Sequence, residues 1–259
     1  MLRKLSGFIV ALLLSASVHA AGGESAPMSI NLAGEQRMLS QRIAKAYAQI
    51  GLNVMPNTAS VQMKDAIGRF ESNLATLESA VADQPAARAA HQRLAASWAV
   101  FRAAAAAPIS QESALALSNL SIDVLDAADR LAQLIADETS SQSTSRIVNL
   151  AGRQRMLSQR LAKAYMLRSW GADSAPVRDE IASVSREFPA GLEALMALGE
   201  TTPEIRLELE EIALQWEWLQ AAISAEGALS FRLVVAEAAD SILDATDRVT
   251  RLYEQLGRP

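Results

Sequence analysis

The stretch NLAGEQRMLSQRIAKAY at residues 31–47 returns as NLAGRQRMLSQRLAKAY at residues 149–165. The two copies lie 118 positions apart and differ only where Arg153 replaces Glu35 and Leu161 replaces Ile43. The same offset aligns further positions without a gap: Phe70 with Phe188, Pro85 with Pro203, Trp98 with Trp216, and LDAADR at 125–130 with LDATDR at 243–248. The chain is therefore a tandem duplication of a unit of about 110 residues.

Composition and breaks predict that each unit is a four-helix bundle. Alanine, the best helix former, accounts for 50 residues, whereas Gly and Pro together account for 20. Short connections favour up-down-up-down topology, so we predict an all-α fold of two tandem four-helix bundles. The expected helices of the first unit are about 29–50, 60–82, 85–107 and 110–138, and the second unit breaks near 171–176, 199–203 and 227.

The N-terminus has the pattern of a secretory signal peptide. Arg3 and Lys4 precede a short apolar run, and small residues lead up to Ala20. The run is shorter than the ~20 residues that a spanning helix needs, and no later stretch is apolar enough to span a membrane. We expect cleavage after residue 20 and a soluble protein exported to a bacterial periplasm.

The domain plan then comprises a first module at 28–138, a Ser/Thr-rich linker at 139–145 and a second module at 146–257. If the linker is a turn, the first helices of the two modules lie side by side and roughly parallel. If the fourth helix instead runs on into the next module, the bundles stack end to end and the two motif copies are far apart. The sequence leaves both arrangements open.

Composition excludes several classes of protein. The chain has no cysteine, which rules out a disulfide framework, a thiolate nucleophile and a zinc–thiolate site. A net charge of −5 excludes a strongly basic nucleic-acid-binding protein. The mature chain has one histidine, His91, which we expect at the surface. Because neither motif copy places a nucleophile beside a base, we expect no enzyme, and no metal or cofactor site.

The first helix carries two stripes at helical spacing. One is apolar and contains Leu39 and Ile43, as a core face requires. The other lies about 140° away and combines small residues with Arg37. The second copy preserves this stripe, although most of residues 51–118 has diverged, so we predict that another helix packs on it. Its members are Ala33, Arg37, Gln41, Ala44 and Ala48, flanked by Gly34 and Lys45.

An arginine among small residues points to anion binding. Arginine stays charged and presents a planar fork of donors, and a glycine one turn earlier permits close backbone approach. If two such helices meet, Arg37 and Arg155 can clamp one small oxyanion. The alternative is an arginine paired with a carboxylate of its own bundle. The predicted ligand-binding residues are Arg37, Arg155, Gly34, Gly152, Gln41 and Gln159.

Structural ion pairs are predicted for the remaining charged motif residues. Arg42 and Arg160 lie nearer the bundle seam and suit acidic partners, for which aspartates of the fourth helix are the obvious candidates. Carboxylates spaced three residues apart on the fourth helix share one face, and salt bridges to the first helix are favoured there over a metal. These carboxylates are Asp126 and Asp129 in the first module, and Asp244 and Asp247 in the second.

The motif Asn-Leu-Ala-Gly-x-Gln-Arg-Met-Leu-Ser-Gln-Arg resembles the signature of PilJ-type domains, the N-terminal sensor domains of type IV pili methyl-accepting chemotaxis transducers. It is also similar to the periplasmic nitrate- and nitrite-sensing segment of NarX-type histidine kinases. In those sensors the first arginine binds the anion between two first helices, and the resemblance assigns this role to Arg37 and Arg155. The chain departs from the kinase type where Gln41 and Gln159 replace a tyrosine.

The resemblance implies a soluble periplasmic sensor that binds nitrate, nitrite or a similar oxyanion and relays its state to a membrane-bound sensor kinase, chemoreceptor or transport system. The two modules would then form a covalent pseudo-dimer. The rival hypothesis is a ligand-free interaction module, whose Gly/Ala/Arg face docks a membrane receptor's own PilJ-type helix. Whether two chains form a homodimer is left open by the sequence.

Overall fold

The computed structural model describes residues 26–138, 142–225 and 229–256. Within these ranges the secondary structure is α-helical, without a β-strand, which confirms the predicted all-α class. No helix of these ranges has the length and apolar character that a membrane span requires. The first unit contains α1 (Ala26–Gly51), α2 (Pro56–Ala80), α3 (Pro85–Ala105) and α4 (Gln111–Asp137), and the second contains α5 (Gln142–Ser169), α6 (Ala175–Met196), α7 (Pro203–Ser224) and α8 (Leu229–Leu256).

Proline and cap residues set several of the helix starts. Pro85 and Pro203 open α3 and α7, where a first-turn proline loses no helical hydrogen bond. Pro56 likewise opens α2, four residues earlier than predicted, after Met55 has turned the chain with a left-handed φ of 47°. Ser110 caps α4 by accepting a hydrogen bond from the Ser113 amide.

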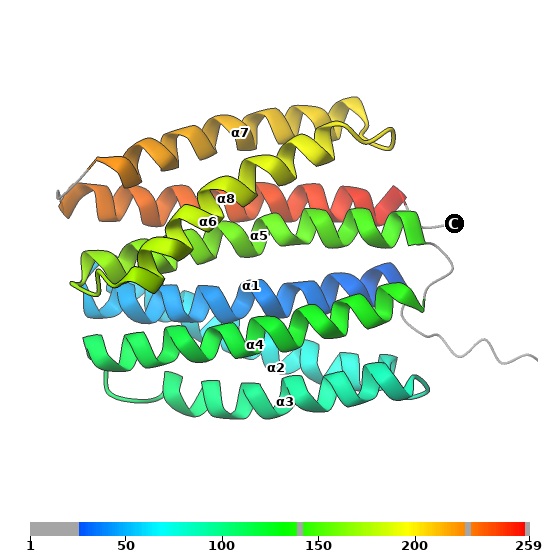
Figure 1. Ribbon diagram of the computed structural model, residues 1–259, viewed down its shortest axis with the longest axis horizontal. Coiled ribbons are helices and arrows are strands. Elements are labelled where there is room, and N and C mark those ends of the chain that lie inside the picture. Colours follow the sequence, from blue (N-terminus) through cyan, green and yellow to red (C-terminus); the bar gives the residue numbers. More distant parts are fainter. Residues whose placement is uncertain (1–25, 139–141, 226–228, 257–259) are drawn as a thin grey trace, which may run out of the picture.

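The two units lie side by side (Figure 1). α1 and α5 run in the same direction through the middle of the molecule and pack against each other, while α3 and α7 lie at opposite edges. This is the arrangement that a turn between the units predicts, and end-to-end stacking is excluded. Residues 142–145, assigned to the linker from sequence, form the first turn of α5, and the predicted signal peptide at residues 1–20 lies outside the described ranges.

The central position of α1 explains its two stripes. Leu39 and Ile43 of the apolar stripe are fully buried within the first bundle. The second stripe is buried as well, and Ala33, Ala44 and Ala48 are each at most 3% exposed. Small side chains let two helix backbones approach closely, so the predicted helix-packing face of α1 is the face that meets the second unit.

Equivalent aromatic stacks join α2 to α3 in the first module and α6 to α7 in the second. Phe70 stacks on Trp98 with ring centroids 3.8 Å apart, and Phe188 stacks on Trp216 at the same separation. Both tryptophans are buried. His91 is not at the surface, contrary to prediction. It is 6% exposed because it faces α2, where its Nε2 lies 2.8 Å from the Leu74 carbonyl oxygen.

Truncation of the stacked phenylalanines tests this packing. We expect Phe70→Ala and Phe188→Ala each to lower the free energy of unfolding by about 3–5 kcal/mol, because each leaves a cavity beside a buried tryptophan. Val61→Ala is the control, since Val61 is 68% exposed and its truncation should change stability by less than about 0.5 kcal/mol. Urea denaturation measures all three, and equal losses for Val61 and either phenylalanine would contradict the packing.

Candidate functional site

The two motif arginines meet at the interface between α1 and α5. Arg37 and Arg155 are the largest fully buried side chains described, 2% and 1% exposed. Each Nη2 lies near the glycine of its own motif copy and also near that of the other copy. The sequence prediction that the two guanidinium groups come together is therefore correct in its geometry.

Each arginine reaches across to the opposite module. Arg37 Nη2 donates a hydrogen bond of 2.7 Å to Asn149 Oδ1, and Arg155 Nη2 donates one of 2.6 Å to Asn31 Oδ1. Asn31 and Asn149 are the first residues of the two motif copies, so the contacts are related by the internal symmetry. Neither asparagine was among the predicted site residues. Their recurrence at the start of an almost invariant run could have identified them.

Each arginine also forms an ion pair with the fourth helix of its own module. Arg37 Nη1 pairs with Asp129, and Arg155 Nη1 lies 2.7 Å from Asp247 Oδ1. Burial lowers the pKa of Arg37, and the Asp129 carboxylate opposes this shift. Two partly exposed carboxylates thus balance the two buried cations, as buried charges require.

The glycines of the motif provide room for the guanidinium groups. A Cβ atom at Gly34 would lie 2.9 Å from Arg37 Nη2, and one at Gly152 would lie 3.1 Å from Arg155 Nη2. Any larger residue would therefore displace the fork that holds Asn149 or Asn31. The role of these glycines is to seat the arginine side chains.

The predicted partners of Arg42 and Arg160 were wrong. Asp129 and Asp247 pair with Arg37 and Arg155, which lie five residues earlier on α1 and α5. Arg160 pairs instead with Glu180 of α6, at 2.7 Å, and Arg42 forms no ion pair within the described ranges.

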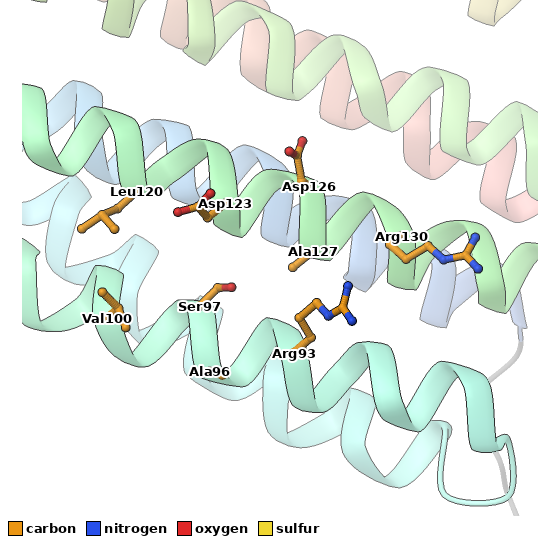
Figure 2. Close-up of a pocket in the computed structure, with 9 residues that line it drawn as sticks. All are labelled: Arg93, Ala96, Ser97, Val100, Leu120, Asp123, Asp126, Ala127 and Arg130. Carbon is orange, nitrogen blue, oxygen red and sulfur yellow. The ribbon is translucent and has the colours of Figure 1, made fainter.

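The other two predicted carboxylates, Asp126 and Asp244, are exposed. Asp126 lines an open groove of about 500 Å³ between α3 and α4, together with Arg93 and Arg130 (Figure 2).

Gln41 and Gln159 tie the first helix of each module to the fourth. Gln41 donates to the Ser121 carbonyl at 3.1 Å, and Gln159 donates to the Ala239 carbonyl at 2.9 Å. Both side chains are fully buried. These contacts give the two glutamines a structural role next to the arginine cluster, whereas their predicted contact with a ligand stays a prediction.

Two buried lysines add further links that sequence reasoning did not foresee. Lys45 Nζ lies 2.5 Å from Asp240 of α8, so this pair joins the two modules. The equivalent Lys163 pairs with Glu180 of its own module at 3.0 Å and donates to Ser121 of α4 at 3.2 Å. Burial lowers the pKa of both lysines. No sequence signal marked these pairs, because the carboxylates stand at different positions in the two repeats.

The one charged difference between the motif copies is compensated. Glu35 pairs with Arg69 of α2, and Arg153 pairs with Glu187 of α6 at 2.7 Å. Positions 69 and 187 are equivalent in the two repeats, so both charges of the pair are exchanged between modules. The link between the first and second helices therefore survives with opposite polarity.

Comparison with known proteins agrees with this duplicated architecture. The profile of the PilJ family, described as the type IV pili methyl-accepting chemotaxis transducer N-terminal domain, matches residues 21–123 and 138–256. The chain belongs to the PilJ family. Searches of curated proteins and of solved structures return no match.

Membership of the PilJ family identifies the chain as a sensory module of the chemotaxis-transducer type. The family is one of sensory domains and not of enzymes, and it is associated with membrane chemoreceptor and pilus signalling systems. The two matched segments correspond to the two halves of the duplication. The PilJ motif therefore occurs twice, and its two arginines meet within a single chain.

Removal of one carboxylate tests the buried ion pair. We expect Asp129→Ala to lower the free energy of unfolding by about 2–4 kcal/mol, because it leaves the Arg37 guanidinium buried without its counter-charge. Asp126→Ala is the matched control: it lies on the same helix, is exposed and forms no ion pair in the described part of the chain, so we expect less than about 0.5 kcal/mol. Chemical denaturation should separate the two variants, and equal effects would refute the role given to Asp129.

The pH dependence of stability tests the buried Lys163–Glu180 pair. Burial opposes ionisation of Glu180, but Lys163 and Arg160 outweigh it and hold its pKa below the ordinary value. Because the pKa of Glu180 is lower in the folded than in the unfolded state, the ion pair contributes its full stability above the unfolded pKa of ~4.3. This contribution is lost as the pH falls through the folded pKa. The stability gap between wild type and Glu180→Gln should therefore shrink on acidification.

Glu193→Gln is the control, because Glu193 lies on the same helix and is exposed. Unfolding in urea from neutral to acidic pH measures the gap for both variants. A gap for Glu180→Gln that is as large at acidic pH as at neutral pH would be inconsistent with the ion pair.

Proposed function

We propose that this protein is a periplasmic sensor whose two PilJ modules act as a covalent pseudo-dimer and bind one small oxyanion, of the nitrate or nitrite type, between Arg37 and Arg155. The observation that carries the proposal is that the two guanidinium groups are buried together at the α1–α5 interface. Each has one nitrogen, Nη2, directed to an acceptor from the opposite module. A planar oxyanion presents the same kind of acceptor to both.

The asparagine oxygens occupy the positions that the anion needs. Nη1 of each arginine is already paired with Asp129 or Asp247. An anion would therefore compete with the asparagine oxygens for the Nη2 donors. It could also accept a hydrogen bond from the Nε of Arg155, which is buried without a partner. Binding would release Asn31 and Asn149 from the opposite arginine. Because these hydrogen bonds link α1 to α5, the exchange would bias the relative position of the two helices.

Charge balance favours a monovalent anion. Arg37 and Arg155 are neutralised by Asp129 and Asp247, so each additional negative charge is buried without a new counter-charge. A divalent anion therefore meets about twice the charge imbalance that a monovalent one meets. Shape acts in the same direction, since a planar oxyanion matches the planar forks.

The state of the interface would be passed to a membrane partner. The association of the PilJ family with chemoreceptor and pilus signalling supports a membrane-bound sensor kinase, chemoreceptor or transport system in this role. A relative shift of α1 and α5 moves two complete bundles, because each of these helices packs against most of its own module. The output would therefore be a change in the relative position of the modules.

The second candidate is a ligand-free interaction module. It is favoured by the aspartate pairing of both arginines, which leaves neither cation in need of an anion. The version in which the Gly/Ala/Arg face of α1 docks a receptor helix is wrong, because α5 already covers that face. A docking function would have to use another surface.

Thermal unfolding with a panel of anions tests the proposal. A ligand at 100 times its dissociation constant adds ~2.7 kcal/mol, which raises the Tm by a few degrees. At matched ionic strength we expect nitrate or nitrite to raise the Tm more than chloride or sulfate. The shift should disappear in Arg37→Lys/Arg155→Lys, which keeps both charges but removes the planar forks.

Arg42→Lys is the control, because Arg42 lies on the same helix and forms no ion pair in the described ranges. It should leave the shift unchanged. A shift that persists in the double variant, or an equal shift with sulfate, would contradict the proposed site. A flat panel from folded protein would favour the ligand-free module.

A further inference from the structure

The outer face of α7 carries a stripe of large apolar side chains, which we call the α7 ridge. It consists of Leu207, Leu214 and Trp218, which are 68%, 60% and 76% exposed. Spacings of seven and four residues place them on one side of the helix over three turns. The opposite side of α7 is anchored separately by buried residues, namely Ile205, Leu209, Ile212, Trp216 and Leu219. The ridge is therefore not needed to attach α7 to its own bundle.

The first module shows what the fold itself requires at these positions. The equivalents of the α7 ridge on α3 are Ala89, Ala96 and Val100. The equivalent helix of the first module thus carries smaller side chains at these positions. The large side chains of the second module therefore serve something other than folding of the bundle. Large exposed apolar patches mark interaction surfaces on soluble proteins.

The small residues of α3 leave a complementary feature. Figure 2 shows Ala96 and Val100 along one wall of the groove between α3 and α4, which has a volume of about 500 Å³. Arg93 and Arg130 lie at one end of this groove, and Asp123 and Asp126 lie along its α4 wall. We call it the α3 groove. α7, which carries the ridge, and α3, which forms one wall of the groove, lie at opposite edges of the molecule (Figure 1).

The two edge helices also carry opposite charge. α3 contains Arg88, Arg93 and Arg102 and no acidic residue. α7 contains one arginine, Arg206, and five glutamates. Two α7 helices placed face to face would repel each other, whereas the arginines of α3 attract α7. The lining of the α3 groove itself is balanced, because Asp123 and Asp126 offset Arg93 and Arg130. The glutamates are Glu204, Glu208, Glu210, Glu211 and Glu217.

From this complementarity we infer that the partner of the α7 ridge is a second copy of this chain, which receives the ridge in its α3 groove. The contact is heterologous, because one edge of a copy binds the opposite edge of the next. Such contacts form chains or rings instead of closed two-fold dimers. The inference does not depend on anion binding, because neither surface includes the arginine cluster.

Sedimentation velocity over a range of protein concentrations tests the inference with two variants. Leu207→Ala/Leu214→Ala/Trp218→Val gives α7 the residues of the first module, and Ala96→Leu/Val100→Trp fills the groove with those of the second. The wild type should form oligomers that weaken with added salt. Each variant alone should raise the dissociation constant by about tenfold or more, because exposed aromatic anchors dominate interface energies.

Mixing the two variants is the decisive step. The first retains an intact groove and the second an intact ridge, so together they should form a 1:1 complex that cannot extend further. Val61→Ala, at a similarly exposed but isolated valine, should associate as the wild type does. Circular dichroism establishes that each variant is folded.

Three results would overturn the inference: a monomeric wild type at all concentrations, a groove variant that associates as the wild type does, or a mixture that stays monomeric. The second result would indicate contact between two α7 helices. Binding of a synthetic Leu/Lys amphipathic peptide to the ridge of a monomeric wild type would assign the ridge to a basic helix of another protein.

Discussion

Two like charges buried side by side determine which residues must surround the α1–α5 interface. Arg37 and Arg155 cannot be buried together unless each meets a counter-charge and acceptors for its remaining donors. Asp129 and Asp247 supply the charge, and the crossed asparagines supply acceptors from the opposite module. This need explains why the motif stayed nearly invariant between the repeats while most of the remaining sequence diverged.

The duplication shows which interactions must be kept and which residues can change. The Glu35–Arg69 pair of one module is the reversed Arg153–Glu187 pair of the other, and the buried lysines keep a carboxylate that has moved to a different helix. Charge balance is preserved in each case, although the residue types are not. A dimer of identical chains cannot diverge in this way, whereas a fused pair can specialise its two halves.

Most of the fold could be predicted from sequence, because the repeat, the breaks and the small-residue stripe of α1 are local patterns. The stripe also predicted that another helix packs on this face of α1, and the pseudo-dimer hypothesis then placed Arg37 beside Arg155. What failed was the choice between two arginines five residues apart: Asp129 was expected to pair with Arg42, although it pairs with Arg37. Five residues turn an α-helix by about 140°, so the two arginines lie on different faces of α1. Which of these faces meets the fourth helix depends on packing throughout the bundle. The Lys45–Asp240 ion pair could not be predicted either, because it joins two modules whose arrangement the sequence left open.

The two motif copies bind each other within one chain, and a double-mutant cycle measures this contact. Arg155→Lys and Asn31→Ala remove the two sides of one inter-module hydrogen bond, and we expect a coupling energy of about 1 kcal/mol in the free energy of unfolding. Arg155→Lys with Asn73→Ala is the reference pair, because Asn73 lies on α2 and bonds to Glu35 on the side of α1 that faces α2, and additivity within ~0.5 kcal/mol is expected. Additivity of the Arg155 and Asn31 substitutions would show that this hydrogen bond does not hold the two motif copies together.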